Sequence, residues 1–295
     1  MDNLLYQHRY EELVKSAEKA LRELTPAATT RPQRLHSAMR YSLEAGGKRL
    51  RPVLCLAAAQ AFQPNADGLH AAVALECIHS YSLIHDDLPC MDNSDLRRGH
   101  PSCHKAFDEA TALLAGDALI PLAFQLIAEG YATKPAIVQA LVAELARAAG
   151  SQLLVGGQAE DMNGHAPGAA ADRLDFILRG KTAALISAPF VMGAIIGGAS
   201  KEDIARCRQA GIAVGIAFQL VDDLLDVTGN AIELGKPAGA DLKNNKLTYP
   251  GLHGFEATRQ RIGELTQVAL NELNACHAKT DFLGTLIAKM AQRTR

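Results

Sequence analysis

Apolar residues recur at helical spacing along almost the whole chain of 295 residues. Between residues 4 and 24 they return every three or four positions, which is the period of one face of an α-helix. The same pattern predicts further helices ending at Ala45, from Pro52 to Phe62, from Asp67 to Asp87, and over 104–130, 134–161, 171–197, 201–228 and 255–292. Strand alternation is missing throughout, so the sequence predicts an all-α fold.

Short breaks marked by Gly and Pro separate these helices, and no long linker divides the chain. We therefore expect one large helical bundle domain over residues 1–295. The composition agrees, because 48% of the residues are hydrophobic but only 5% are aromatic and Trp is absent. A core of small and aliphatic side chains favours closely packed helices over a sandwich or a barrel.

Charge and cysteine usage exclude several classes of protein. Lys and Arg number 30 against 32 Asp and Glu, so there is no basic field for a nucleic-acid partner. The six cysteines never form C-x-x-C, which favours reduced thiols over disulfides or a zinc site. The polar, charged start of the chain does not resemble a secretory signal, and we expect a cytoplasmic protein.

One uncharged stretch, residues 182–200, could be mistaken for a membrane span. It contains Gly193-x-x-x-Gly197, a pattern that can pack membrane helices. Ser187 and Pro189 interrupt it, and Lys181 and Lys201 bound it closely. We interpret it as a buried helix of a large helical protein and expect no transmembrane segment.

Two clusters of carboxylates stand at the ends of apolar helical segments. The first holds Asp86, Asp87 and Asp92, and the second holds Asp222, Asp223 and Asp226. On an ideal helix the first and last acids of the second cluster lie about 40° apart and one turn along the axis. Carboxylates crowded among apolar residues are costly unless cations pair with them. Mg²⁺ prefers such oxygen ligands and takes substrate phosphates as further ligands, so the clusters predict a magnesium site.

Basic residues occur in several short motifs near glycine or proline. They are Lys48, Arg49 and Arg51 after Gly46-Gly47, Arg97 and Arg98, Lys181 before Thr182, Lys236, and Lys246. Together they offer the guanidinium and ammonium groups that bind diphosphates. His79 lies about 20° from Asp86 on the helical wheel and could face the same cavity or serve as a core residue. Glu76-x-x-His79 also matches one arm of a di-iron motif, but the sequence contains no second arm.

These motifs resemble those of the trans-isoprenyl diphosphate synthases, and most closely the bacterial farnesyl diphosphate synthases. The likeness rests on residues 47–52, the acids at 86–92 with Arg97-Arg98-Gly99, Lys181-Thr182, Gln219 with the second acidic cluster, and residues 246–250. All occur in the family's order and span nearly the whole chain. The resemblance implies the isoprenoid synthase fold, a helical bundle around a central cavity, and a homodimer.

The resemblance also implies a role for each matching residue. The metal ligands would be the six acids, chiefly Asp86, Asp92 and Asp222, holding three Mg²⁺ ions per site with Mn²⁺ able to substitute. Isopentenyl diphosphate would be held by Lys48, Arg51, His79 and Arg98. The allylic diphosphate would be held by Arg97, Lys181, Thr182, Gln219, Lys236 and Lys246. Gln158 and Asp161 match a further polar position that lines the site.

The implied reaction is ionisation of an allylic diphosphate (dimethylallyl or geranyl), condensation with isopentenyl diphosphate, and loss of a proton. An aromatic residue at Tyr81, beside the small Ser82, goes in this family with a fifteen-carbon product, so farnesyl diphosphate is expected. The alternatives are a geranylgeranyl or geranyl diphosphate synthase, a catalytically silent subunit, and a class I terpene cyclase, which would not need the second diphosphate site. Ala183 and Asn93-Ser94 depart from the family's usual residues without removing an expected ligand.

Overall fold

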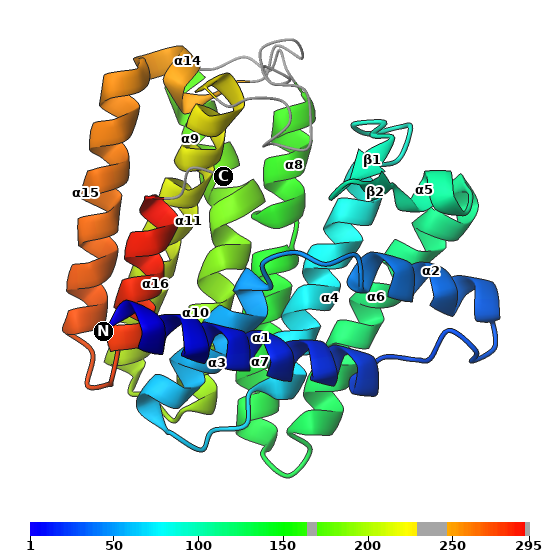
Figure 1. Cartoon of the computed structure of the whole chain (residues 1–295), viewed down its shortest axis with the longest axis horizontal. Helices are drawn as coiled ribbons and strands as arrows, with labels where there is room; N and C mark the ends of the chain where they lie inside the picture. The colour runs from blue at the N-terminus through cyan, green and yellow to red at the C-terminus, as the bar shows by residue number, and fades with distance from the viewer. Residues whose placement is uncertain (164–169, 229–246, 293–295) are drawn as a thin grey trace.

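The structure is a computed structural model that describes residues 1–163, 170–228 and 247–292 (Figure 1). Helices dominate it, which confirms the all-α prediction. The first half contains helices α1 (Asn3–Leu24), α2 (Gln33–Leu43), α3 (Leu50–Phe62), α4 (Leu69–Asp86), α5 (Cys103–Ala106) and α6 (Glu109–Gly130) and strands β1 (Leu96–Arg97) and β2 (His100–Pro101).

The second half continues with helices and one π-helical turn, η1. The elements are α7 (Pro135–Ala149), α8 (Leu154–Met162), α9 (Ala170–Ile177), η1 (Leu178–Ala183), α10 (Ala184–Ile196), α11 (Lys201–Thr228), α14 (Tyr249–His253), α15 (Phe255–Asn274) and α16 (Asp281–Ala291). Helix α4 packs along α6, and α10 packs along both α3 and α11. Helix α1 crosses the front of the bundle over α3 and α4 (Figure 1).

Small residues let the central helices approach closely. A Cβ at Gly211 of α11 would lie 2.6 Å from the Cα of Ser187, and one at Gly215 would lie 2.4 Å from the Cα of Ala183. One cluster of buried side chains extends from Tyr6 in α1 to Met290 in α16. The expectation of a core built from small and aliphatic residues is confirmed.

The uncharged segment at residues 182–200 forms the buried helix that the sequence predicts, because every residue from Ala184 to Ala194 is buried. Among the described residues, one helix is long and apolar enough to cross a membrane. It is α6, not the helix at 182–200. Its mean hydropathy reaches 1.7, and only 39% of that window is buried. Helix α6 packs on α4, so one of its sides is already covered by protein.

Three predicted helices are shorter than expected. The helix expected over 104–130 breaks before α6, because the Asp108 carboxylate caps the new helix by accepting a hydrogen bond of 2.7 Å from the Thr111 amide. The one expected over 134–161 breaks at residues 150–153, and the one over 255–292 breaks at 275–280. Each break contains polar or glycine residues, which interrupt a helical pattern.

A small β-hairpin was not predicted. Leu96 pairs with Pro101, and Arg97 pairs with His100. Arg98 and Gly99 between them have φ values of +54° and +79°, which is typical of a tight type I′ turn. Each strand has only two residues, which is too short to show the alternation of apolar and polar residues by which a strand is recognised in a sequence.

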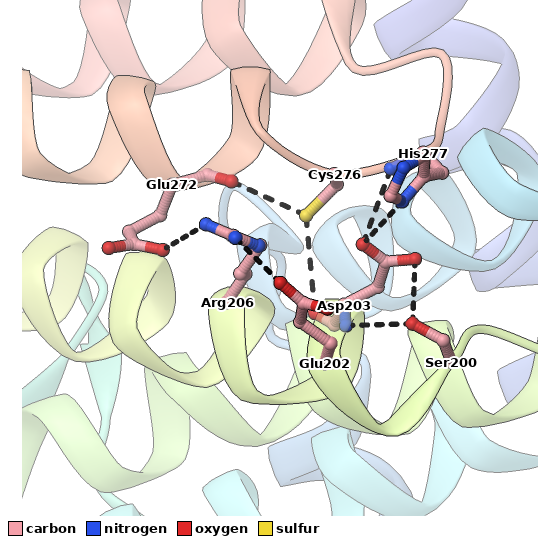
Figure 2. Close-up of polar contacts among 7 residues, drawn as sticks. All are labelled: Ser200, Glu202, Asp203, Arg206, Glu272, Cys276 and His277. Carbon is pink, nitrogen blue, oxygen red and sulfur yellow. Dashed lines mark hydrogen bonds and ion pairs between the residues drawn. The ribbon is translucent and has the colours of Figure 1, made fainter.

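The start of α11 is fastened to the connection between α15 and α16 (Figure 2). The Asp203 carboxylate accepts hydrogen bonds from the Ser200 hydroxyl at 2.9 Å and from the His277 amide at 3.3 Å. The Cys276 thiol also donates to the Asp203 carbonyl, at 4.0 Å. These contacts hold in place the helix whose other end carries the second acidic cluster.

Candidate active site

The helices enclose a cavity of about 840 Å³, within the range usual for small-molecule sites. Its walls come mainly from α4, α8, η1 and α11. The charged lining residues are Asp86, Asp92, Asp161, Asp222, Asp223, Asp226, Lys48, Arg51, Arg97 and Lys181. Both acidic clusters therefore reach one cavity, as the sequence predicts.

The first acidic cluster begins at Asp86, the last residue of α4. Burial, assisted by the nearby Asp92, raises the pKa of Asp86 to about 6, although Lys181 acts in the opposite direction. The chain then folds back, and the Asp92 amide donates to the Asp86 carbonyl at 2.9 Å. This turn brings the two acids to the same side of the cavity.

Asp87 has a different environment. It is 2% exposed, and both of its carboxylate oxygens accept hydrogen bonds from Arg97, at 3.1 and 3.2 Å from Nε. The pair joins the end of α4 to the β-hairpin, so Asp87 holds Arg97 at the edge of the cavity. Metal ligation by Asp87 stays a prediction.

The second acidic cluster is organised by a chain of hydrogen bonds. The Thr182 hydroxyl donates to the Gln219 side-chain oxygen at 2.7 Å, and the Gln219 nitrogen donates to the Asp223 carboxylate at 2.8 Å. The Tyr249 amide donates to the other oxygen of Asp223 at 3.4 Å. Asp223 is 4% exposed, whereas Asp222 is half-buried in the cavity wall. The chain therefore fixes Gln219 and Thr182 beside the acids.

The acids suit a hard divalent cation that is completed by a ligand. Within the ranges described, no group of three or more Asp, Glu, His or Cys side chains is close enough to hold a metal ion by itself. Mg²⁺ is commonly bound by one or two carboxylates together with substrate phosphates. Facing carboxylates in a cavity that raises the pKa of Asp86 fit this mode of binding.

Lys181 is placed by η1, and π-helical turns are frequent at functional sites. A Cβ at Gly157 of α8 would lie 2.2 Å from the backbone nitrogen of Lys181, so the close approach of α8 to η1 needs glycine at this position. The Lys181 ammonium is 2.6 Å from the Asp161 carboxylate. Gln158, one turn before Asp161, also lines the cavity. The further polar position expected around these two residues is thus at the site.

A second group of cations lies at the start of α3. Lys48 and Arg51 line the cavity there, and His79 of α4 lines the same part of it. Burial lowers the pKa of Arg51 to about 10, although Glu76 raises it. Burial and the neighbouring arginines, Arg51 foremost, lower the pKa of His79 well below its ordinary value, so the imidazole is neutral at pH 7.

Arg98 approaches this group from the hairpin. Its guanidinium donates to the Gly46 carbonyl and packs against Gly47, where a Cβ would lie 2.7 Å from Arg98 Cζ. Gly47 also has a φ of +112°. Both this backbone conformation and the close approach of Arg98 need glycine at this position.

Tyr81 and Ser82 also line the cavity, one turn of α4 before Asp86. Lys236 and Lys246 lie outside the described residues, and their expected roles stay predictions. The partner of Glu76 was not predicted from the sequence: its carboxylate accepts a hydrogen bond from Arg49 at 2.9 Å. The sequence does place Glu76 in the middle of an apolar helix, which indicates that it needs a partner. The pattern around it matched only one arm of a di-iron motif and did not identify Arg49.

Comparisons with known proteins agree with this geometry. The family model described as polyprenyl synthetase matches residues 32–283. The large subunit 1 of a heterodimeric geranylgeranyl pyrophosphate synthase, chloroplastic, from Arabidopsis thaliana is 46% identical over 269 residues, covering 88% of this chain and 72% of the relative.

Two solved structures share the fold closely. An FPP/GFPP synthase from Zymomonas mobilis has a TM-score of 0.85 and 35% identity over 98% of this chain and 99% of its own. A geranyltransferase from Helicobacter pylori, complexed with magnesium and isoprenyl diphosphate, has a TM-score of 0.83 and 32% identity over 97% of this chain and 98% of its own.

Proposed function

The chain belongs to the polyprenyl synthetase family, and from that premise we propose that it condenses isopentenyl diphosphate with an allylic diphosphate in a Mg²⁺-dependent reaction. The observation that carries the proposal is the single cavity of about 840 Å³ that both acidic clusters and two separate groups of cations line. Two cationic groups suit two diphosphate substrates, whereas a terpene cyclase needs one. Both acidic clusters are intact, which disfavours a silent subunit.

Asp86, Asp92, Asp222 and Asp226 are the residues that would hold the magnesium ions. Bound Mg²⁺ supplies positive charge that stabilises a departing diphosphate. The number of ions, three by family resemblance, is part of the proposal.

The chain's own residues provide binding and orientation. Lys181, presented by η1, neutralises the allylic diphosphate, and the Thr182–Gln219–Asp223 chain holds the Gln219 amide ready to contact it. Preorganised donors of this kind favour the developing anion in a dry site. Leu185 and Phe218 are among the apolar residues that shield an allylic cation from water. The departing diphosphate accepts the proton that is lost after condensation.

For product length, we propose geranylgeranyl diphosphate as the final product. The Arabidopsis thaliana relative, named as a geranylgeranyl pyrophosphate synthase subunit, favours twenty carbons over the fifteen predicted from the sequence. Farnesyl diphosphate is the second candidate, because the Tyr81 ring stands in the wall of the cavity and is 7% exposed.

Product analysis tests both the activity and the length. The chain is incubated with radiolabelled isopentenyl diphosphate and dimethylallyl, geranyl or farnesyl diphosphate, and the dephosphorylated products are separated by chromatography. Geranylgeraniol from all three primers supports the proposal. Accumulation of farnesol, with no use of the farnesyl primer, supports the second candidate. No condensation with any primer contradicts the proposed function itself.

Replacing Arg51 with alanine is expected to raise the KM for isopentenyl diphosphate by about 10- to 100-fold, because charge-assisted hydrogen bonds to a diphosphate are lost. The KM for the allylic substrate should change less than about twofold. Initial rates with each substrate varied in turn measure both values. Arg179→Ala, which removes an exposed arginine of η1, is the matched control. Equal increases in both KM values would contradict the assignment of Arg51.

We propose that two chains associate through α6. Leu113 and Leu114 on this helix are 46% and 56% exposed, and they extend the apolar surface of a helix only partly buried in one chain. Light scattering should give twice the chain mass of 31.4 kDa. Leu114→Glu should shift the mass towards one chain, because dimerisation would then bury a charge. A monomeric parent protein at micromolar concentration would contradict the homodimer.

The single domain over 1–295 stays a proposal, and a plastid is proposed in place of the cytoplasmic location expected from the sequence. The continuous buried cluster from α1 to α16 supports the first. The Arabidopsis thaliana relative is named chloroplastic, which favours a plastid over the cytoplasm. Fractionation of cells that express the tagged chain would decide between the two locations.

A further inference from the structure

Arg49 stands between two residues that line the cavity but is itself buried. Lys48 and Arg51 reach the cavity, whereas the Arg49 side chain is only 3% exposed. Arg49 precedes the first turn of α3 and has a φ of +47°, a left-handed conformation that residues with a side chain seldom adopt. The burial of the side chain and this uncommon backbone conformation both draw attention to the contact that Arg49 makes.

That contact is a buried ion pair with α4. Arg49 Nη1 donates to Glu76 Oε1 at 2.9 Å, and the Glu76 side chain is also 3% exposed. Glu18 of α1 lies 3.6 Å from Arg49 Nε on the more exposed side of the pair. The pair therefore ties the loop before α3 to the middle of α4, where α1 crosses both helices.

Both partners are neighbours of the residues assigned to isopentenyl diphosphate. Arg49 follows Lys48 directly and precedes Arg51 by two residues. Glu76 precedes His79 by three residues, so the two lie on the same side of α4. The two halves of the isopentenyl diphosphate site, which come from different helices, are thus joined by one ion pair.

We propose that Arg49 and Glu76 are positioning residues for the isopentenyl diphosphate site, holding Lys48 and Arg51 in register with His79. This inference rests on the proposed function. A bound diphosphate needs its cations at fixed separations, and the pair sets the separation between α3 and α4 at this end of the cavity. Burial makes the pair rigid, because an unpaired charge at either position would be strongly unfavourable.

The sign of the effect of Glu76→Gln separates positioning from simple electrostatics. Glu76 is a negative charge near an anion site and raises the pKa of both Arg51 and Arg98, against their burial. If the charge alone mattered, its removal would tighten the binding of isopentenyl diphosphate. Positioning predicts the opposite, since Arg49 loses its partner and the loop that carries Lys48 and Arg51 relaxes.

The experiment measures both KM values, kcat and the melting temperature of Glu76→Gln and Arg49→Lys. We expect Glu76→Gln to raise the KM for isopentenyl diphosphate about tenfold, with the allylic KM within about twofold. Arg49→Lys keeps the charge but loses the planar guanidinium. Its KM for isopentenyl diphosphate should therefore lie between that of the parent chain and that of Glu76→Gln. Arg49→Lys also serves as the test if Glu76→Gln does not fold.

Glu144→Gln is the matched control for loss of a buried acid. Glu144 is 5% exposed and accepts hydrogen bonds from Arg208 at 2.7 and 2.8 Å, which join α7 to α11. It is not one of the described residues that line the cavity. Its loss should lower the melting temperature and leave both KM values unchanged.

Three outcomes would overturn the positioning role. They are an unchanged or lowered KM for isopentenyl diphosphate in Glu76→Gln, an equal rise in both KM values of that variant, or the same KM change in Glu144→Gln. All three are measured against a parent chain that is active. A parent chain that condenses no substrate pair would instead contradict the proposed function, so the two failures are distinguishable.

Discussion

Replacing Asp86 or Asp222 with alanine is expected to lower kcat by about 10²- to 10³-fold or more, because each change removes a ligand for the ions that stabilise the departing diphosphate. The helical circular dichroism signal should persist. Turnover should also disappear in excess EDTA and return when Mg²⁺ is added. Kinetic assays and circular dichroism on the two variants measure these effects.

Asp86→Ala should also be at least as stable as the parent chain at pH 7. Burial raises the pKa of Asp86 to about 6, so ionisation of this group costs folding free energy as the pH rises through that value. Removing the group removes the cost. Loss of activity without loss of stability distinguishes a functional acid from a structural one.

Asp175→Ala is the control for loss of a carboxylate. Asp175 is an exposed residue of α9 whose carboxylate is 2.6 Å from Arg179. Its removal should leave turnover near the parent value. Near-normal turnover of either active-site variant, or of the parent chain in EDTA, would contradict the metal-dependent mechanism.

The apolar periodicity of the sequence was sufficient to predict most of the helices. It works for α1, α4 and α11 because each buries one continuous face or lies wholly in the core. It failed at Asp108, where the helical pattern continues across a break that a side-chain cap creates. It also could not detect η1, because a π-helical turn has the same composition as the α-helices around it.

The acidic and basic motifs were sufficient to predict which residues meet at the cavity. They could not show which of them are already paired, because pairing depends on how distant segments pack. Asp87 is turned towards Arg97 by the hairpin, and Asp223 is bonded to Gln219 and Tyr249. The Arg49–Glu76 pair joins residues that are 27 positions apart, and no local spacing reports such a contact.

We predict that product length depends on Tyr81, and the structure describes how this residue packs. The Tyr81 ring is packed edge-on against His85, with ring centroids 5.7 Å apart. His85 is itself held against α6, since its Nε2 lies 3.1 Å from the Leu113 carbonyl and a Cβ at Gly116 would lie 2.1 Å from it. Tyr81 therefore packs against a side chain that is itself held in place, and we expect its ring to stay in the cavity wall during elongation.

Tyr81→Ala is expected to lengthen the main product by at least one five-carbon unit, whether the parent chain stops at fifteen or at twenty carbons. Tyr81 lies about 7.5 Å along α4 from Asp86, where a chain growing away from the diphosphates would meet it. Removing the ring opens that part of the cavity, and chromatography of the radiolabelled alcohols measures the change. Tyr81→Phe keeps the ring and should keep the parent product. A folded, active Tyr81→Ala variant with the parent product would show that another side chain ends elongation.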